Sequence, residues 1–67
     1  MGDTKLGKNL KEARTKLELT QKQVAEKAEV NTNWYARIER GEENASLETL
    51  KKLAKILKVK VSDLIPF

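Results

Sequence analysis

The groups that could do chemistry in this chain are amides, guanidinium groups, ammonium groups and carboxylates, since it contains neither cysteine nor histidine. Without thiolates and imidazoles, the usual zinc sites and imidazole bases cannot be built. The ten acidic residues are scattered along the chain rather than clustered. The sequence therefore predicts neither an enzyme nor a metal site, and no other cofactor is expected.

The side chains best suited to recognising another molecule through hydrogen bonds lie between positions 32 and 40. Asn33 and Arg37 are four residues apart, so a helix would present both on one side. An asparagine amide pairs with adenine, and an arginine guanidinium pairs with guanine. Thr32 and Ala36 lie beside them and carry methyl groups that suit the methyl of thymine. The same residues also describe the wet face of an ordinary helix, which the helical pattern alone favours.

Several helices must hold this segment in place, because the apolar spacing is helical almost throughout the chain. Helices are predicted over residues 4–17, 21–28, 32–40, 47–58 and 63–65. Thr20 and Gln23 fit a capping box at the start of the second helix. Asn31, Ser46 and Ser62 are suitable N-caps for the three later helices.

The inward faces of these helices predict one all-α domain over residues 1–67. The residues expected inside are Leu6, Leu10, Ala13, Leu17, Val24, Ala25, Ala28, Tyr35, Ile38, Leu47, Leu50, Leu53, Ala54 and Leu57. A chain of 67 residues can build only one such core. A buried cavity for a small-molecule ligand would compete with that core, so none is expected. The longest apolar run is too short to span a membrane, and a cytoplasmic location is expected.

Fourteen basic residues against ten acidic ones give a net charge of +4. This balance suits a polyanionic partner, but a solvated, lysine-rich surface would produce it equally well. Five lysines near the C-terminal end are interpreted as such a solvated face: Lys51, Lys52, Lys55, Lys58 and Lys60.

Two short helices joined by a tight turn at residues 29–31 describe a helix-turn-helix. The segment 20–41 resembles the corresponding domain of phage Cro and repressor proteins, the XRE family. The matching residues are Thr20-Gln21, Val24-Ala25, Val30-Asn31 and Ile38-Glu39-Arg40-Gly41, continued by Leu50, Leu53-Ala54, Leu57 and Val59. The resemblance implies a compact five-helix domain of the lambda-repressor type that binds double-stranded DNA and regulates transcription.

Within that family, Glu39-Arg40-Gly41 followed by Asn44-Ala45-Ser46-Leu47 is similar to the controller proteins of restriction-modification systems. The resemblance implies a dimer on a palindromic operator, with the helix over residues 32–40 in the major groove. RNA polymerase is a further candidate partner. A protein-interaction module, such as an antitoxin or adaptor with the same helices, is the alternative.

The resemblance also favours DNA contact over a merely wet helix face. Base contacts are expected from Thr32, Asn33, Ala36 and Arg37. Contacts with the DNA backbone are expected from Gln21, Trp34, Arg40 and Asn44. For Trp34, packing on the protein is an equal alternative.

Two further expectations concern structure rather than DNA. The family pairs the positions of Arg14 and Glu39 in a largely buried salt bridge. It has glycine where Glu29 and Glu18 stand, so left-handed backbone is expected there at a cost of about 1 kcal/mol each.

The C-terminal end carries much apolar area for so small a chain. An exposed apolar patch on a soluble protein often marks an interface. The predicted dimer surface consists of Val59, Val61, Leu64, Ile65 and Phe67. The alternative is a self-contained monomer whose C-terminal end packs on its own core.

Overall fold

Local signals start most of the helices where the sequence predicts. The computed structural model describes residues 4–66 and contains, within them, α1 (Thr4–Lys16), α2 (Gln21–Ala28), α3 (Thr32–Glu39), α4 (Leu47–Ile56) and α5 (Val61–Leu64). The Thr20 hydroxyl accepts a hydrogen bond from the Gln23 amide at 3.0 Å, and the Gln23 side chain accepts one from the Thr20 amide at 2.8 Å. The predicted capping box is therefore confirmed.

The other N-caps divide into two that are confirmed and one that is wrong. Asn31 Oδ1 accepts from the Trp34 amide at 3.1 Å, and Ser46 Oγ accepts from the Thr49 amide at 3.1 Å. Ser62, in contrast, lies inside α5, whose N-cap is Lys60. The Lys60 amide donates to Asp63 Oδ2 at 3.1 Å, so a carboxylate at the third helical position fixes the start of this turn.

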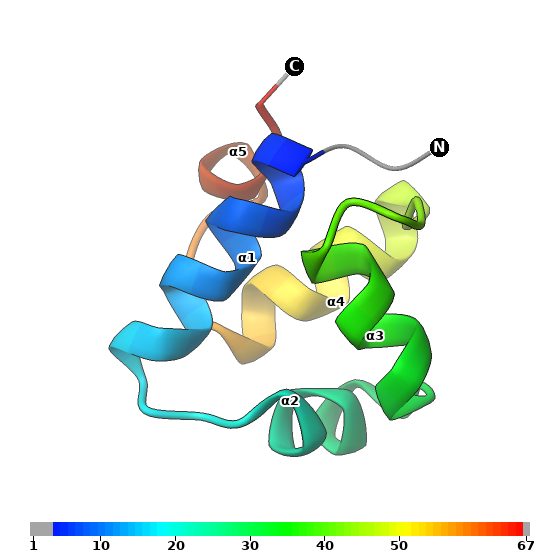
Figure 1. Ribbon diagram of the computed structural model, residues 1–67. Coiled ribbons are helices and arrows are strands. Elements are labelled where there is room, and N and C mark those ends of the chain that lie inside the picture. Colours follow the sequence, from blue (N-terminus) through cyan, green and yellow to red (C-terminus); the bar gives the residue numbers. More distant parts are fainter. Residues whose placement is uncertain (1–3, 67) are drawn as a thin grey trace.

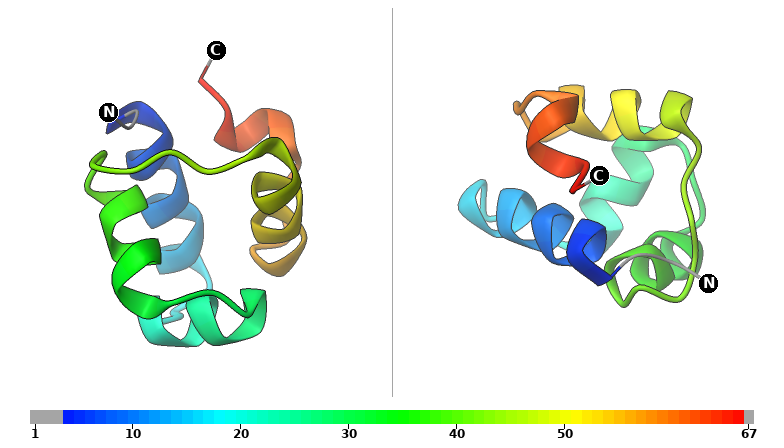
Figure 2. Two further views of the ribbon diagram at one scale, coloured as in Figure 1. Left: turned by 90° about the vertical axis from the view of Figure 1, so that its right-hand side faces the viewer. Right: turned by 90° about the horizontal axis from the view of Figure 1, so that it is seen from above.

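The five helices surround one core (Figure 1). α1 lies against α3 and α5, α2 lies against α3 and α4, and α4 lies against α5. Figure 2 shows α1 and α3 side by side, with α4 on the other side of the core. The Asn9 amide ties the first and last helices together by donating to the Leu64 carbonyl at 2.9 Å.

The core consists mainly of the residues predicted to face inward. Its buried members are Leu6, Leu10, Ala13, Val24, Ala25, Ala28, Tyr35, Ile38, Leu50, Leu53, Ala54, Leu57 and Leu64. Leu47 was expected inside but is 55% exposed. It is the first residue of α4 and lies beyond the edge of the core. Leu17 is only half-buried, because α1 ends one residue before it.

Three non-glycine residues adopt the left-handed conformation. Glu18 and Glu29 have φ angles of 56° and 59°, as the family comparison of these positions implies. Lys58 has a φ angle of 60°, which a continuing helix cannot accommodate. The prediction that the fourth helix reaches Lys58 is therefore wrong, and α4 ends at Ile56.

A glycine allows α1 to approach the end of α3 closely. A Cβ atom at Gly7 would collide with the backbone carbonyl oxygen of Glu39 and would lie 2.7 Å from that of Ile38. No helix within residues 4–66 combines the length and the apolar character needed to cross a membrane.

Candidate nucleic-acid interface

The turn between α2 and α3 is held from three directions. Glu29 is the left-handed C-cap of α2, and the Val30 amide donates to the Ala25 carbonyl at 3.0 Å. From α4, Lys52 Nζ donates to the Ala28 carbonyl at 3.3 Å. Lys52 therefore has a partner at the C-terminus of α2, where a cation is favourable. It remains exposed, as expected for a solvated face, and this hydrogen bond is an additional contact that the sequence did not indicate.

α3 has one buried side and one exposed side. Tyr35 and Ile38 are 0% exposed and fix the helix in the core. Asn33 and Arg37 are exposed, and Thr32 and Ala36 are half-buried between the two sides. The helix thus presents an amide and a guanidinium group to solvent. Because its opposite side is buried in the core, the helix cannot rotate about its axis.

The end of α3 is joined to α1 by a largely buried ion pair. Arg14 Nε lies 2.7 Å from Glu39 Oε2, and Arg14 Nη2 lies 3.0 Å from Glu39 Oε1. The two side chains are only 14% and 3% exposed. Arg14 Nη1 also donates to the Leu19 carbonyl at 2.8 Å, so one guanidinium group joins α1, the loop after it and α3.

A third polar side chain from α2 completes this network. Gln21 Nε2 donates to Glu39 Oε1 at 3.1 Å. Because an ionised carboxylate only accepts hydrogen bonds, the amide nitrogen of Gln21 must face Glu39. The half-buried Gln21 retains one N–H and its carbonyl oxygen for another partner. The contact with Glu39 therefore orients the residue expected at the DNA backbone.

The ionisation of the network follows from its contacts. Burial raises the pKa of Glu39, but the hydrogen bonds from Arg14, the neighbouring Tyr35 hydroxyl, the hydrogen bond from Gln21 and the Arg14 charge together outweigh burial, so this pKa lies below its usual value. Burial raises the pKa of Tyr35, and the Glu39 carboxylate adds to the rise. The Tyr35 hydroxyl is a neutral group, buried beside the ion pair without a hydrogen bond of standard geometry.

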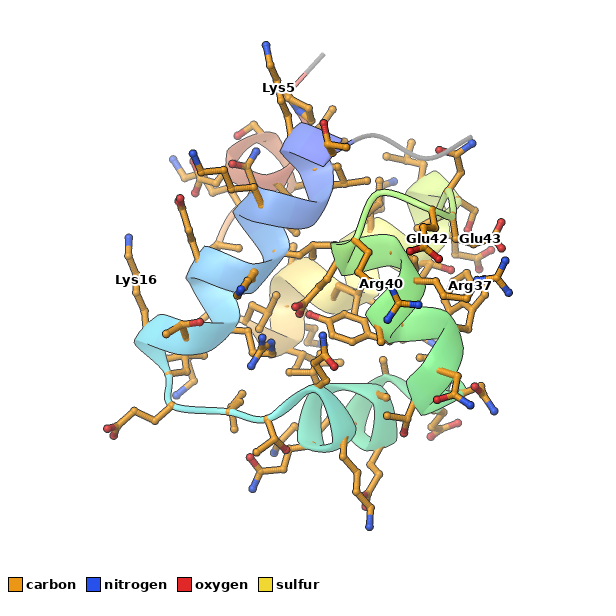
Figure 3. The ribbon with its side chains drawn as sticks, viewed as in Figure 1. Lys5, Lys16, Arg37, Arg40, Glu42 and Glu43 are labelled. Atoms are coloured by element: carbon orange, nitrogen blue, oxygen red, sulfur yellow. The ribbon has the colours of Figure 1, made fainter. Side chains whose placement is uncertain are left out.

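Beyond α3, two acidic residues contact the two arginines that the sequence assigns to DNA. Arg40 Nε lies 2.8 Å from Glu42 Oε2, and Arg37 Nη2 lies 3.5 Å from Glu43 Oε2. Figure 3 shows the four side chains gathered at one side of α3. These contacts were not predicted from the sequence. Their signal is the Glu-Glu pair that follows Gly41, because Gly41 turns the chain back toward the helix.

The other two residues predicted to contact the DNA backbone, Asn44 and Trp34, lie in different environments. Asn44 is exposed in the loop between α3 and α4. Trp34 is partly buried and packs against the core. Of its two alternatives, the structure contains the packing contact.

The residues predicted at a dimer surface do not all lie on the surface. Leu64 is 1% exposed and belongs to the core, so its assignment to an interface is contradicted. Val59, Val61 and Ile65 are partly buried and remain accessible at the edge of the core. Phe67 lies outside the described residues.

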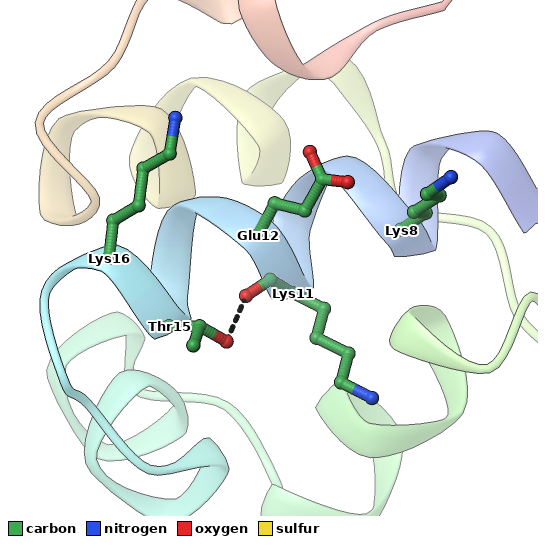
Figure 4. A pocket seen from close by; sticks show the side chains of 5 residues that line it. All are labelled: Lys8, Lys11, Glu12, Thr15 and Lys16. Atoms are coloured by element: carbon green, nitrogen blue, oxygen red, sulfur yellow. Dashed lines mark hydrogen bonds between the residues drawn. The ribbon is translucent and has the colours of Figure 1, made fainter.

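A shallow hollow lies along the outer side of α1 (Figure 4). All of its lining residues come from that single helix: Lys8, Lys11, Glu12, Thr15 and Lys16. It is a surface groove rather than an enclosed ligand pocket. Residues 4–66 contain no cluster of side chains that could hold a metal ion.

Comparison with known proteins places this geometry in a family. Residues 10–64 match the helix-turn-helix family HTH_3. The chain is 40% identical over 60 residues to an immunity repressor protein of Bacillus phage phi105; the match covers 90% of this chain and 42% of that repressor.

Solved structures with similar sequences have the same fold. The restriction-modification controller protein C.AhdI from Aeromonas hydrophila superposes with a TM-score of 0.88 at 32% identity, covering 92% of this chain and 94% of that one. The regulator SinR of Bacillus subtilis, solved in complex with DNA, superposes with a TM-score of 0.83 at 32% identity, covering 88% and 95% of the two chains.

Proposed function

The chain belongs to the HTH_3 helix-turn-helix family of DNA-binding transcriptional regulators, and we propose that it binds a palindromic operator as a homodimer with α3 in the major groove. In this role it acts in the cytoplasm, where it controls transcription from a promoter that the operator adjoins. A bound dimer at such a site is also positioned to contact RNA polymerase.

The observation that carries the proposal is the division of α3 into a buried and an exposed side. Tyr35 and Ile38 anchor the helix, while Asn33 and Arg37 extend into solvent. A recognition helix needs both properties, because base contacts require side chains held in a fixed register. The complex of SinR with DNA supports the assignment at the level of the fold.

The side chains of the exposed side divide by chemistry. Asn33 suits adenine and Arg37 suits guanine, each through paired hydrogen bonds, and the methyl groups of Thr32 and Ala36 suit thymine. Gln21 donates to phosphate with the N–H that Glu39 leaves free. Arg40 and Asn44, further along the same side, also contact phosphate. Such contacts position the protein without specifying sequence.

A dimer would supply the two-fold symmetry of the operator. Val59, Val61 and Ile65 offer apolar area at the edge of the core for a second copy. Two recognition helices in a symmetric dimer lie about 34 Å apart, one turn of DNA. The likeness to C.AhdI supports a restriction-modification controller, and the likeness to the phage repressor supports an immunity repressor. The genes that adjoin the selected operator distinguish these two roles.

The experiment begins with selection of bound sequences from a random DNA pool, which gives the operator, its symmetry and the spacing of its half-sites. Arg37→Ala and Arg40→Ala are then measured on single-base variants of that operator at several salt concentrations. We expect Arg37→Ala to lose about 1–3 kcal/mol and the preference at one base pair per half-site. Arg40→Ala should weaken binding to all sequences alike and lower the salt slope by about one per lost contact.

A matched control removes a cation far from α3. Lys16 lies on α1, on the opposite side of the view in Figure 3, and Lys16→Ala should leave base preferences unchanged. If Arg40→Ala changes base preference and Arg37→Ala does not, the two roles are reversed. If the pool yields no enriched sequence, the protein does not read DNA, and an antitoxin or adaptor function replaces this proposal.

A further inference from the structure

Each arginine on the exposed side of α3 already has an acidic partner in the protein. Arg40 bonds Glu42 through both Nε at 2.8 Å and Nη2 at 3.4 Å, so two of its three nitrogens are occupied. Arg37 contacts Glu43 through Nη2 alone, at 3.5 Å. Figure 3 shows both pairs on the same side of α3. Glu42 therefore holds Arg40 through two hydrogen bonds, whereas Glu43 holds Arg37 through one longer contact.

The backbone fixes these carboxylates next to α3. The Gly41 amide donates to the Ile38 carbonyl at 3.1 Å, and the Glu42 amide donates to the Arg37 carbonyl at 2.8 Å. Gly41 has a φ angle of 77° and is buried against Thr4, where an added Cβ would lie 2.6 Å from Thr4 Cγ2. The loop is thus folded back onto the helix, and its backbone holds both glutamates beside the two arginines.

We infer that Glu42 and Glu43, here called the acidic pair, make DNA binding selective by occupying the two arginines in place of phosphate. The inference rests on the proposed function of α3. DNA of arbitrary sequence attracts a protein almost entirely through its phosphates. A carboxylate beside each arginine opposes that attraction by competing for the cation and by repelling the phosphate.

Glu42 and Glu43 have different effects on DNA binding because Arg40 is proposed to contact phosphate and Arg37 to contact guanine. Arg40 must leave Glu42 to reach phosphate on any DNA, so Glu42 lowers affinity for all sequences alike. Arg37 engages Glu43 with one nitrogen and keeps its other donors free for the acceptors of guanine. Glu43 can therefore remain in place on the operator as a positioning residue for Arg37. On DNA of any other sequence, where Arg37 would have to reach phosphate, Glu43 only opposes binding.

The test compares Glu42→Gln, Glu43→Gln and a matched control, Glu12→Gln, on the operator and on random-sequence DNA. Each change removes one negative charge, and Glu12 lies on α1, away from the acidic pair. Glu42→Gln should tighten binding to both DNAs by the same factor, up to about fivefold at low salt, and raise the salt slope by up to about one. Glu43→Gln should tighten binding to random DNA but not to the operator, so the ratio of the two affinities falls.

The outcomes separate this inference from the proposed function. If Glu43→Gln changes both affinities by one factor, or if both variants match Glu12→Gln, the acidic pair does not set selectivity, although operator binding stands. If the wild-type protein binds no DNA, both the inference and the proposed function are overturned. Glu12 and Glu42 are exposed and Glu43 is half-buried, and circular dichroism verifies that the variants stay folded.

Discussion

Two ion pairs of nearly equal length should differ sharply in what they contribute to stability. Arg14 and Glu39 are joined at 2.7 Å, and Arg40 and Glu42 at 2.8 Å. The first pair is 14% and 3% exposed, and the second is 56% and 53% exposed. Distance therefore predicts equal effects, whereas burial predicts that only the first pair is important for folding.

Arg14→Ala leaves a buried carboxylate with Gln21 as its one remaining hydrogen-bond donor of standard geometry, and it also strips the Leu19 carbonyl of its donor. Breaking a buried pair in this way costs about 3–5 kcal/mol. A domain of this size has a total stability of roughly 3–10 kcal/mol. Arg14→Ala should therefore be partly unfolded at room temperature. Arg40→Ala should leave stability unchanged, because water screens an exposed pair.

Urea unfolding followed by circular dichroism measures both variants. Glu39→Gln and the double variant Arg14→Ala/Glu39→Gln complete a cycle, and the double variant should lose less than the sum of the single losses. Equal unfolding midpoints for Arg14→Ala and Arg40→Ala would refute the argument from burial.

The same pair predicts a pH dependence whose sign follows from Glu39. Its pKa is lower in the folded protein than in the unfolded chain. The resulting stabilisation is present above the unfolded value of about 4.3, and it is lost as the pH falls through the lower folded value. Wild-type protein should therefore lose more stability than Glu39→Gln between about pH 5 and pH 3. Parallel losses in the two proteins would show that Glu39 is not the group responsible.

Three further predictions concern the backbone and the dimer. Glu29→Gly should raise stability by about 0.5–1 kcal/mol, because the residue has a φ angle of 59°, whereas Glu26→Gly within α2 should lower it by about 1 kcal/mol. Gly7→Ala should cost about 1–3 kcal/mol or more in urea unfolding, because the new methyl group meets the backbone of α3; a variant as stable as wild type would mean that α1 can move aside. In sedimentation at micromolar concentration, the wild-type chain should show twice its monomer mass and Ile65→Glu should shift toward the monomer; a strict monomer, free and on DNA, would exclude the dimer.

The features that the sequence predicts well depend on a few neighbouring residues. The caps at Thr20, Asn31 and Ser46 each act three positions along the chain. The inward residues follow from helical spacing, and the resemblance to the XRE family predicts the ion pair between Arg14 and Glu39. The assignment of Ser62 as an N-cap is wrong because the intrinsic preference of serine for that position is weaker than the packing of Val61 and Leu64, which starts the helix two residues earlier.

Contacts between distant segments were not predictable from spacing. Gln21 reaches Glu39 across 18 positions, Lys52 reaches the end of α2 across 24, and Asn9 reaches Leu64 across 55. The contacts of Glu42 and Glu43 are close in sequence, but they depend on the direction in which Gly41 turns the chain. These contacts change the interpretation of the site, because Arg37 and Arg40 each have an acidic partner within the protein.

The rigidity of the exposed side of α3 must come from outside the helix. α3 has only eight residues, and isolated helices shorter than about 12–15 residues are marginal in water. Its start depends on Asn31, its middle on the core, and its end on Arg14 and on the close approach that Gly7 allows. Changes in α1 should therefore weaken DNA binding without touching DNA. A screen that measures binding alone would assign Arg14 to the DNA interface together with Arg37. Only a parallel measurement of unfolding distinguishes a residue that contacts DNA from one that holds α3 in position.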